Sequence, residues 1–372
     1  NNKNNNKNNN NKNNNNNNIN NNGSFKIFKK LLNIYDEMDV LLDRFPDKKL
    51  YDKVKYEFEI FVGKKFKPLL KNKYKMYNLS QAGLKMNEML ITFKKLLPKK
   101  KNIKTFHICE APGNFIMMID YYVKNVLKGK LNWKSQSLNP KHPKNIKKYG
   151  KDIVDDYYNF IKNNPDKWLY GADGTGDITN IKNIKNYSKY CKDVDLITSD
   201  CGLGPMNRSK HGHKLLFSSI LFMLMNVPHG KNCLLKLYLP VDNKMYIYMV
   251  NLLYIYFKKT YVYKPMLNFR SGEYYLICIG KKKIPSSLIK ELCKKSFKPK
   301  KVNDFGFLLQ LFEFSKQIII KRNEQLERLL YLMNNYDLIT ESEHLLIGKI
   351  RDKRIDEWIH KYLFLVDSRK TT

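Results

Sequence analysis

From about residue 104 onward, short apolar runs alternate with longer amphipathic segments. Apolar runs bounded by turn signals are typical of buried strands, and the longer segments have helical spacing. Strands that alternate with helices favour an α/β fold with a parallel, doubly wound sheet. The pattern predicts strands at 104–109, 168–172, 194–199, 233–239, 261–264 and 274–280, and helices at 114–127, 153–163, 212–227 and 244–256. Between 131 and 172 the pattern is less regular and includes a Pro- and Lys-rich loop.

The final pair of strands departs from the parallel arrangement. Only about nine residues separate Lys264 from Tyr274, and a parallel crossover needs a dozen or more. The last strand should therefore run antiparallel, which brings its first residues to the carboxyl edge of the parallel strands. Glu273 is then expected at the same edge as Asp200 and the end of the strand that contains Lys236.

Helical patterns flank the α/β region on both sides. We divide the chain into an Asn-rich disordered tail, a helical extension, the α/β domain and a basic helical extension, at 1–23, 24–75, 76–283 and 284–372. Residues 79–97 predict a helix with Ser80 as its N-cap. The amphipathic helices expected at 302–333 and 342–364 are compatible with a cap on the sheet or with a separate interaction module, and the sequence leaves both open.

Composition indicates a polyanionic partner. The 372 residues carry a formal net charge of +35, with 42% hydrophobic and 13% aromatic residues, enough for a packed core. A surplus of this size favours RNA or DNA. The abundance of Asn, Lys, Ile and Tyr also suits an AT-rich genome, as in a large DNA virus or a protist, which accounts for part of the charge. No apolar run reaches the roughly 18 residues that span a bilayer, and the polar N-terminus does not resemble a signal peptide, so no membrane partner is expected.

The six cysteines form no Cys-x-x-Cys pair and no regular framework. Four of them lie in apolar or strand-like runs. This distribution favours reduced, buried thiols in an intracellular protein of the nucleus or the cytoplasm, a viral factory or a virion included. Their positions are Cys109, Cys191, Cys201, Cys233, Cys278 and Cys293.

Two polar turns form the candidate ligand site. The turn after the first strand has the sequence Glu110, Ala111, Pro112, Gly113, Asn114, Phe115. Gly113 permits a close backbone approach, and the helix start that follows offers free N–H groups and a positive dipole end. The turn is neither GxGxxG nor a P-loop. The second turn, DGTGDIT at 173–179, offers Asp173 and Asp177 to hydroxyl or adenine amine groups. Together they describe a nucleoside pocket without a phosphate clamp, for which S-adenosylmethionine is a suitable ligand.

Three ionisable residues, Asp200, Lys236 and Glu273, interrupt apolar strands. A buried lysine is costly unless it is paired, and desolvation or a nearby cation lowers its pKa towards that of a usable base. The alternative is an edge-strand lysine that extends to water. His211 and His213 are expected on the loop after Asp200, in reach of substrate. No further ligands at suitable spacing accompany them, so no metal site is expected.

The stretches CEAPGNF, DGTGDIT, SDCGLG, LLKLYLP and SGEYYLICIG, in that order, resemble the FtsJ-like RNA 2′-O-ribose methyltransferases, above all the cap-methylating branch of cells and large DNA viruses. SQAGLKMNEML resembles the helix that carries the first catalytic lysine of that family. The resemblance covers about residues 75–283 and implies a Rossmann-like methyltransferase fold. The Lys-Asp-Lys-Glu tetrad of the family falls on Lys85, Asp200, Lys236 and Glu273. Asn114 and Cys201-Gly202 depart from the usual residues, which alters the expected cofactor contacts.

The resemblance implies S-adenosylmethionine as methyl donor, bound by Glu110–Phe115, Asp173, Asp177 and Asp200. Lys236 would be the general base that removes the proton of a ribose 2′-hydroxyl. Lys85 would lower the pKa of that base, and the two carboxylates would orient both ammonium groups. The implied function is methylation of cap-proximal nucleotides of mRNA, with no metal.

Two alternatives to this function stay open. The first is 2′-O-methylation of ribosomal or transfer RNA, and the second is a catalytically silent RNA-binding subunit. RNA is the expected partner in every case, capped mRNA being favoured, and the oligomeric state is left open. The candidates for an RNA track are Lys94, Lys95, Lys99, Lys100 and Lys101.

Overall fold

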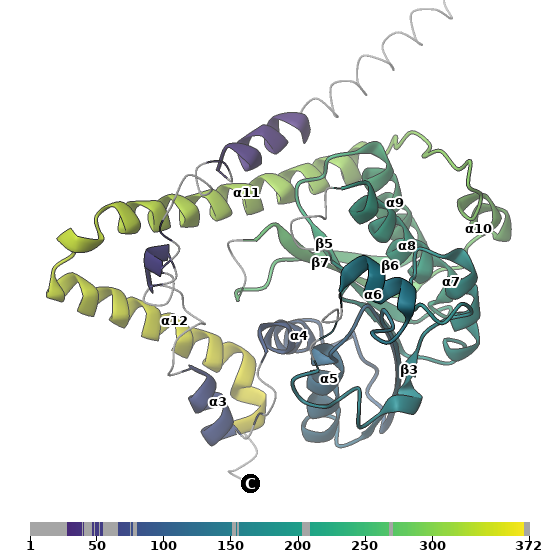
Figure 1. The fold of residues 1–372 in the computed structure, drawn as a ribbon, viewed down its shortest axis with the longest axis horizontal. Helices are drawn as coiled ribbons and strands as arrows, with labels where there is room; N and C mark the ends of the chain where they lie inside the picture. Colours follow the sequence, from purple (N-terminus) through teal and green to yellow (C-terminus); the bar gives the residue numbers. More distant parts are fainter. Residues whose placement is uncertain are drawn as a thin grey trace, which may run out of the picture.

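The computed structural model describes residues 28–38, 40, 47, 49–51, 53–54, 66–74, 76, 80–150, 154, 156–202, 209–267 and 271–367 (Figure 1). The tail predicted at 1–23 lies outside the described residues. Within the described residues, a seven-stranded sheet has the order β3-β2-β1-β4-β5-β7-β6. Its strands are β1 (Asn102–Ile108), β2 (Lys130–Gln136), β3 (Trp168–Leu169), β4 (Leu196–Ser199), β5 (Asn232–Tyr238), β6 (Phe257–Tyr263) and β7 (Glu273–Lys281).

The sheet is parallel except at β7, which pairs antiparallel with both β5 and β6. The predicted α/β fold with an antiparallel last strand is confirmed. The connection from β6 to β7 is too short for a crossover, so the chain turns back along the strand that it has just left. In the register of β5 and β7, Tyr238 lies opposite Glu273, which brings the start of β7 to the carboxyl edge of β5.

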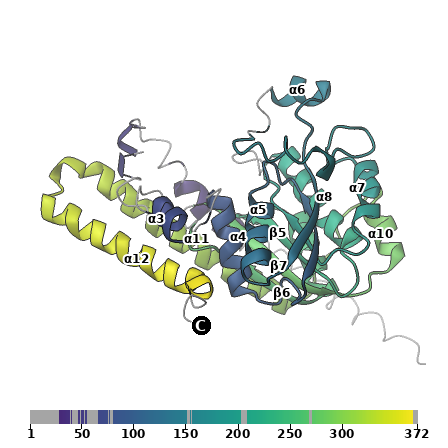
Figure 2. The ribbon, with the colours of Figure 1, turned by 90° about the horizontal axis from the view of Figure 1, so that it is seen from below.

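Helices cover both faces of the sheet (Figure 2). On one face, α4 (Gln81–Thr92) packs against α5 (Asn114–Asn125) over an apolar cluster. On the other face lie α7 (Ile181–Tyr187), α8 (Lys210–Asn226) and α9 (Lys244–Tyr256). Successive side chains of β5 point to opposite faces of the sheet, so Leu234 belongs to the apolar cluster on the first face and Leu235 to that on the second. The sheet is therefore buried on both sides, as its apolar strands predicted.

The C-terminal extension packs on the α/β region. It contains α10 (Ser286–Leu292), α11 (Phe305–Asn334) and α12 (Glu341–Asp367), and α12 runs back towards α3 (Phe66–Tyr74) and α4 (Figure 1). Trp358 of α12 is fully buried, and its ring lies edge-on to that of Phe66 at 5.2 Å between centroids. The indole N–H of Trp358 donates to Oε1 of Glu88 in α4 at 2.8 Å. None of the described helices is long and apolar enough to cross a bilayer.

Two segments between β1 and β3 differ from the prediction. β2 is a strand where an irregular segment was expected, because its sequence, KLNWKSQ, is mostly polar and lacks an apolar run. Helix α6 (Pro143–Tyr149) replaces the expected Pro- and Lys-rich loop. It begins with Pro143, whose fixed φ suits a first helical turn, and the side chain of His142 accepts from the N–H of Lys144.

The helix predicted at 153–163 is wrong for its described part. Residues 153 and 155 lie outside the described residues, and 156–164 form turns. The carboxylate of Asp156 accepts hydrogen bonds from the N–H groups of Phe160, Ile161 and Lys162. These bonds satisfy the backbone locally and compete with a regular helix.

The prediction of reduced thiols is wrong for one pair of cysteines. Cys109 and Cys201 form a disulfide, with their Cα atoms 4.9 Å apart. β1 and β4 are neighbours, with Ile108 opposite Ser199, so the residues that follow the two strands meet at the same edge. Sequence spacing could not show this, because 92 positions separate the two residues. The other cysteines are free thiols: Cys191, Cys233 and Cys278 are buried, and Cys293 is half-buried.

Candidate active site

The turn between β1 and α5 is built around Gly113. Its φ of 108° lies in the left-handed region, and a Cβ added there would lie 2.4 Å from Cδ1 of Phe160. A side chain at this position would therefore both strain the backbone and displace the aromatic ring. Oε1 of Glu110 accepts a hydrogen bond from the N–H of Phe115 at 2.7 Å, which fixes the acid over the first turn of α5.

Two buried acceptors beside this turn lack a partner within the described part of the chain, Oε2 of Glu110 and Oδ1 of Asn114. Burial and the nearby Asp200 raise the pKa of Glu110 well above its usual range. Buried acceptors of this kind call for a donor. The amino group and the ribose hydroxyls of S-adenosylmethionine are such donors, and its ammonium would bring the pKa of Glu110 back down. The residues present thus fit the cofactor.

The DGTGDIT turn is held by hydrogen bonds among its own side chains and from Asn180 and Asn183 at the start of α7. Burial would raise the pKa of Asp173, but hydrogen bonds from Thr175, Asn183 and Asn180 bring it far below its usual value. Its carboxylate is thus directed into the turn. Oδ1 of Asp177 accepts from the N–H of Thr179 at 2.8 Å.

The same turn is tied to the end of β2. The side chain of Gln136 donates to the carbonyl of Gly176. A Cβ on Gly176 would lie 1.9 Å from the carbonyl oxygen of Ser137, so the close approach of the two segments requires glycine. The two turns predicted to bind the cofactor therefore follow β1 and β3, with the end of β2 between them.

The four candidate tetrad residues form two ion pairs. Nζ of Lys85, in α4, lies 2.5 Å from Oε1 of Glu273, at the start of β7. Nζ of Lys236, in β5, lies 2.9 Å from Oδ1 of Asp200, directly after β4. Lys85 and Glu273 are buried, with 6% and 8% of their surface exposed. The structure thus brings together, from four elements, the residues that the sequence analysis grouped.

The charge state of Lys236 differs from expectation. Burial alone would lower the pKa of Lys236, but Asp200, Tyr238 and Glu273 together raise it above its ordinary value. The expected lowering of this pKa is therefore wrong. A carboxylate at 2.9 Å in a buried site outweighs the desolvation of the ammonium.

Sequence reasoning missed Lys264, a half-buried lysine beside the tetrad. Its Nζ donates to the carbonyl oxygens of Ser271 and Glu273, both at 2.5 Å. Burial lowers the pKa of Lys264 to about 7, against the opposing effect of Glu273. The hydroxyl of Tyr275 donates to Oε1 of Glu273 at 2.7 Å. Hydrogen bonds thus hold both the backbone and the side chain of Glu273. The only sequence signal for the role of Lys264 was its position between the end of a strand and a proline.

Glu88, one helical turn after Lys85, was also missed. It is fully buried and accepts hydrogen bonds from the hydroxyl of Tyr263, the N–H groups of Met266 and Leu267, and the indole of Trp358. The helix that carries Lys85 is therefore anchored to the chain before β7 and to α12. An acid within the apolar run Met86–Leu90 was the available signal.

The histidines and the basic cluster lie elsewhere than expected. His211 and His213 are in the first turn of α8 rather than on a loop, since Ser209 caps that helix through the N–H of Gly212. Nε2 of His213 lies 2.8 Å from Oδ2 of Asp242. The cluster Lys94–Lys101 precedes β1, at the amino edge of the sheet, where Lys100 pairs with Asp195. It is thus at the edge opposite the tetrad, which argues against it as the RNA track.

The comparisons with known proteins agree with this geometry. The FtsJ-like methyltransferase model matches residues 79–281. An uncharacterized protein of Acanthamoeba polyphaga mimivirus, L511, is 29% identical over 316 residues, covering 80% of this chain and 39% of that protein. The cap-specific mRNA (nucleoside-2'-O-)-methyltransferase 2 of Drosophila melanogaster is 28% identical over 226 residues, covering 57% of this chain and 31% of that protein. The chain spans less than half the length of these two relatives.

Among solved structures, a ribosomal RNA methyltransferase from Plasmodium falciparum superposes with a TM-score of 0.36 and 18% identity, over 55% of this chain and 99% of that chain, too loosely to inform the site. The family match carries more weight. It runs from the start of α4 to the end of β7 and so includes every strand and all four tetrad positions. The chain belongs to the FtsJ-like methyltransferase family.

Proposed function

We propose that the protein methylates ribose 2′-hydroxyls of RNA, at cap-proximal nucleotides of mRNA. The observation that carries this proposal is the presence of two ion pairs, the buried Lys85–Glu273 and the half-buried Lys236–Asp200, at the edge that also holds the Gly113 turn. The Drosophila relative acts, by its name, on the mRNA cap, which favours the same substrate for this chain. The high positive charge suits an RNA partner.

In this proposal Lys236 takes the proton of the 2′-hydroxyl, and the oxygen then attacks the methyl carbon. Bound S-adenosylmethionine supplies a methyl group already activated by its sulfonium, so the chain contributes mainly positioning and a base. Lys236 must first lose its own proton. Positive charge that bound ligands bring to this edge would offset Asp200 and Glu273 and so lower the pKa of Lys236. Lys85 and Asp200 would orient the groups around it.

Two other functions are weighed against this one. A ribosomal or transfer RNA substrate needs the same tetrad and differs only in the RNA that is bound. A silent RNA-binding subunit has no need of four charges gathered at one edge, of which Lys85 and Glu273 are buried and therefore costly to keep without a role. The two ion pairs therefore favour an active enzyme. Its place of action would be that of capped RNA, in the nucleus or the cytoplasm, or in a viral factory or virion.

The test is transfer of labelled methyl groups to RNAs of one sequence, capped and uncapped, by the wild type and by Lys236→Ala. Incorporation on capped RNA alone, lost in the variant, is the expected result. Equal incorporation on both RNAs would move the substrate to ribosomal or transfer RNA. No incorporation on either RNA, with RNA still bound, would favour the silent subunit.

A further inference from the structure

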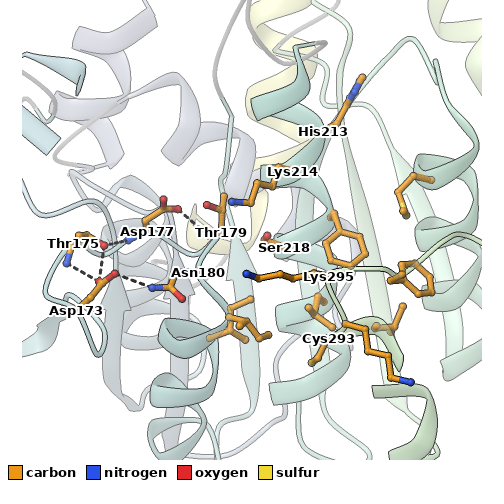
Figure 3. A pocket seen from close by; sticks show the side chains of 18 of the residues that line it. Asp173, Thr175, Asp177, Thr179, Asn180, His213, Lys214, Ser218, Cys293 and Lys295 are labelled. Carbon is orange, nitrogen blue, oxygen red and sulfur yellow. Dashed lines mark hydrogen bonds between the residues drawn. The ribbon is translucent and has the colours of Figure 1, made fainter. Parts of the chain in front are cut away.

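A cleft of about 800 Å³ lies between the DGTGDIT turn and helix α8 (Figure 3). We call it the α7–α8 cleft. One wall is residues 173–180, the other is α8, and the segment 293–297 after α10 closes one end. None of the four tetrad residues and no residue of the Gly113 turn lines it. It is thus a separate cavity that shares only the DGTGDIT turn with the expected cofactor site.

The floor of the cleft is apolar and partly aromatic. Ile184 and Leu221 lie there, and the rings of Phe217 and Phe297 are 6.0 Å apart between centroids. Aromatic side chains are the surfaces on which proteins stack unpaired bases of RNA. A cavity of this volume with a few polar groups on one wall accepts a group the size of a nucleoside.

Cations from three elements converge on the cleft. Its lining includes five lysines, from α6, α8 and the segment after α10, but only two aspartates: Lys144, Lys148, Lys214, Lys294, Lys295, Asp173 and Asp177. Asp173 already accepts hydrogen bonds from Thr175 in its own turn and from Asn180 and Asn183 at the start of α7. In Figure 3 the amino groups of Lys214 and Lys295 both point across the cleft towards the DGTGDIT wall. Two ammonium groups directed into one cavity from different elements suit a phosphate.

Helix α6 is fixed above this region. The hydroxyl of Tyr149, at the end of α6, lies 3.2 Å from Nε2 of His211 in the first turn of α8. The amide of Asn145, also in α6, donates to the carbonyl of Thr175 at 2.7 Å. α6 is therefore joined to both walls, and the lysines that it contributes are held at the rim rather than on a free segment.

We propose that the α7–α8 cleft binds one nucleotide of the RNA substrate, with its base on Phe217 and Phe297 and its phosphate on Lys214 and Lys295. This inference rests on the proposed function and adds to it a second RNA contact, away from the methyl-transfer edge. The polar wall of Asp177, Thr179 and Asn180 offers partners to base edges and ribose hydroxyls. An acidic peptide would use the lysines, but it would leave the aromatic floor without a matching group.

The test is the affinity for a 12-nucleotide capped RNA, labelled with fluorescein at its 3′ end, measured by anisotropy over a series of salt concentrations. The variant is Lys214→Glu with Lys295→Glu. The matched control is Lys94→Glu with Lys99→Glu, an equal charge change on exposed lysines of the amino edge. We expect the cleft variant to bind at least 10-fold more weakly and to lose about one unit of the salt slope, because the two lysines share one phosphate. The control should change less than threefold.

Three further outcomes are informative. Equal weakening by both double variants would overturn the proposal, because general charge would then explain the binding. Loss of affinity for S-adenosylmethionine in the cleft variant, with RNA binding kept, would overturn it by making the cleft part of the cofactor site. Displacement of the RNA by polyglutamate as readily as by unlabelled RNA would overturn it in favour of an acidic protein partner.

Folding and the proposed function are controlled separately. Lys214→Arg with Lys295→Arg keeps both charges and should retain RNA binding, whereas a weakening as large as that of the glutamate variant would contradict a phosphate contact. The binding assay needs no methyl transfer. If the wild type transfers no methyl group but binds RNA more tightly than the cleft variant does, the proposed function is rejected and the RNA site in the cleft is supported. If the wild type is active and the cleft variant binds RNA as tightly as the wild type does, the proposed function is supported and the RNA site in the cleft is rejected.

Discussion

The ammonium of Lys236 lies 2.9 Å from Oδ1 of Asp200, and this pair holds the pKa of the lysine above its ordinary value. A lysine in this state is a poor base until its proton is released. The carboxylate of Asp200, at the carboxyl edge of β4, therefore sets the pH above which Lys236 could act as a base.

Replacement of Asp200 by Asn should lower the pKa of Lys236. Because the carboxylate raises that pKa, its loss shifts the acidic limb of the profile of kcat/KM against pH to lower pH, even where the rate itself falls. The measurement is that profile for residual activity, beside Asp193→Asn, whose carboxylate pairs with Lys104 at the opposite edge. A limb that stays in place or moves to higher pH would argue against the proposed base.

Lys264→Met should lower kcat more than it raises KM for RNA. The substitution removes both hydrogen bonds that fix the backbone before and at Glu273. Misplacement of a positioning group by about 1 Å can cost roughly 100-fold in rate, and we expect a loss of roughly 10- to 100-fold. Steady-state kinetics with varied RNA test this, with Lys259→Met on the exposed side of β6 as control. An unchanged kcat would mean that Glu273 is held without Lys264.

The same residue gives stability a defined pH dependence. The folded-state pKa of Lys264 is lowered to about 7, so between there and its unfolded value the unfolded chain binds more protons. Its contribution to stability therefore rises with pH across that window and is absent below it. Thermal unfolding at pH 6 and pH 9 should show a smaller gain at high pH for Lys264→Met than for the wild type. An equal gain in both proteins would contradict a depressed pKa.

Trp358→Phe should destabilise the protein by about 1–3 kcal/mol, the cost of removing a hydrogen bond to a buried charged group. The indole N–H is one of the donors that keep the carboxylate of Glu88 satisfied between α4 and α12. Urea unfolding gives the free energy, with Tyr331→Phe on the exposed side of α11 as a near-neutral control. A null effect would indicate that α12 does not contribute to the stability of the α4 region.

Gly113→Ala should weaken the binding of S-adenosylmethionine at least 10-fold. A Cβ would displace Phe160 and shift the turn whose Glu110 and Asn114 fit the cofactor. Gly150→Ala is a matched control, because Gly150 also has a positive φ but has nothing within 4 Å of an added Cβ. Calorimetric titration measures both. Equal affinities for the two variants would place the cofactor away from this turn.

Much of the fold followed from the sequence because burial and chain length constrain it. The apolar runs of β4 and β5 marked buried strands, and a connection of about nine residues required β7 to turn back. The meeting of Asp200, Lys236 and Glu273 at one edge followed from that topology.

The remaining features depend on contacts between distant segments. β2 was hidden by its polar composition, because Ser135 and Gln136 are buried without being apolar, so no hydrophobic run marks the strand. The Cys109–Cys201 disulfide depends on the register of β1 with β4, which local sequence does not encode. The role of Glu88 depends on hydrogen-bond donors more than 170 positions away. The role of Lys264 depends on backbone acceptors up to nine positions further along the chain. The raised pKa of Lys236 could not be foreseen, because it follows from the positions of Asp200, Tyr238 and Glu273 around the ammonium.

The central claim is that this enzyme transfers a methyl group to a ribose 2′-oxygen with Lys236 as base. The most direct measurement is mass spectrometry of nucleosides from capped RNA incubated with S-adenosylmethionine and the wild type, Lys236→Ala or Lys259→Ala. We predict a 2′-O-methylated nucleoside next to the cap with the wild type and Lys259→Ala, and a loss of roughly 100-fold or more with Lys236→Ala. Methylation on a base, or full 2′-O-methylation by Lys236→Ala, would contradict the account.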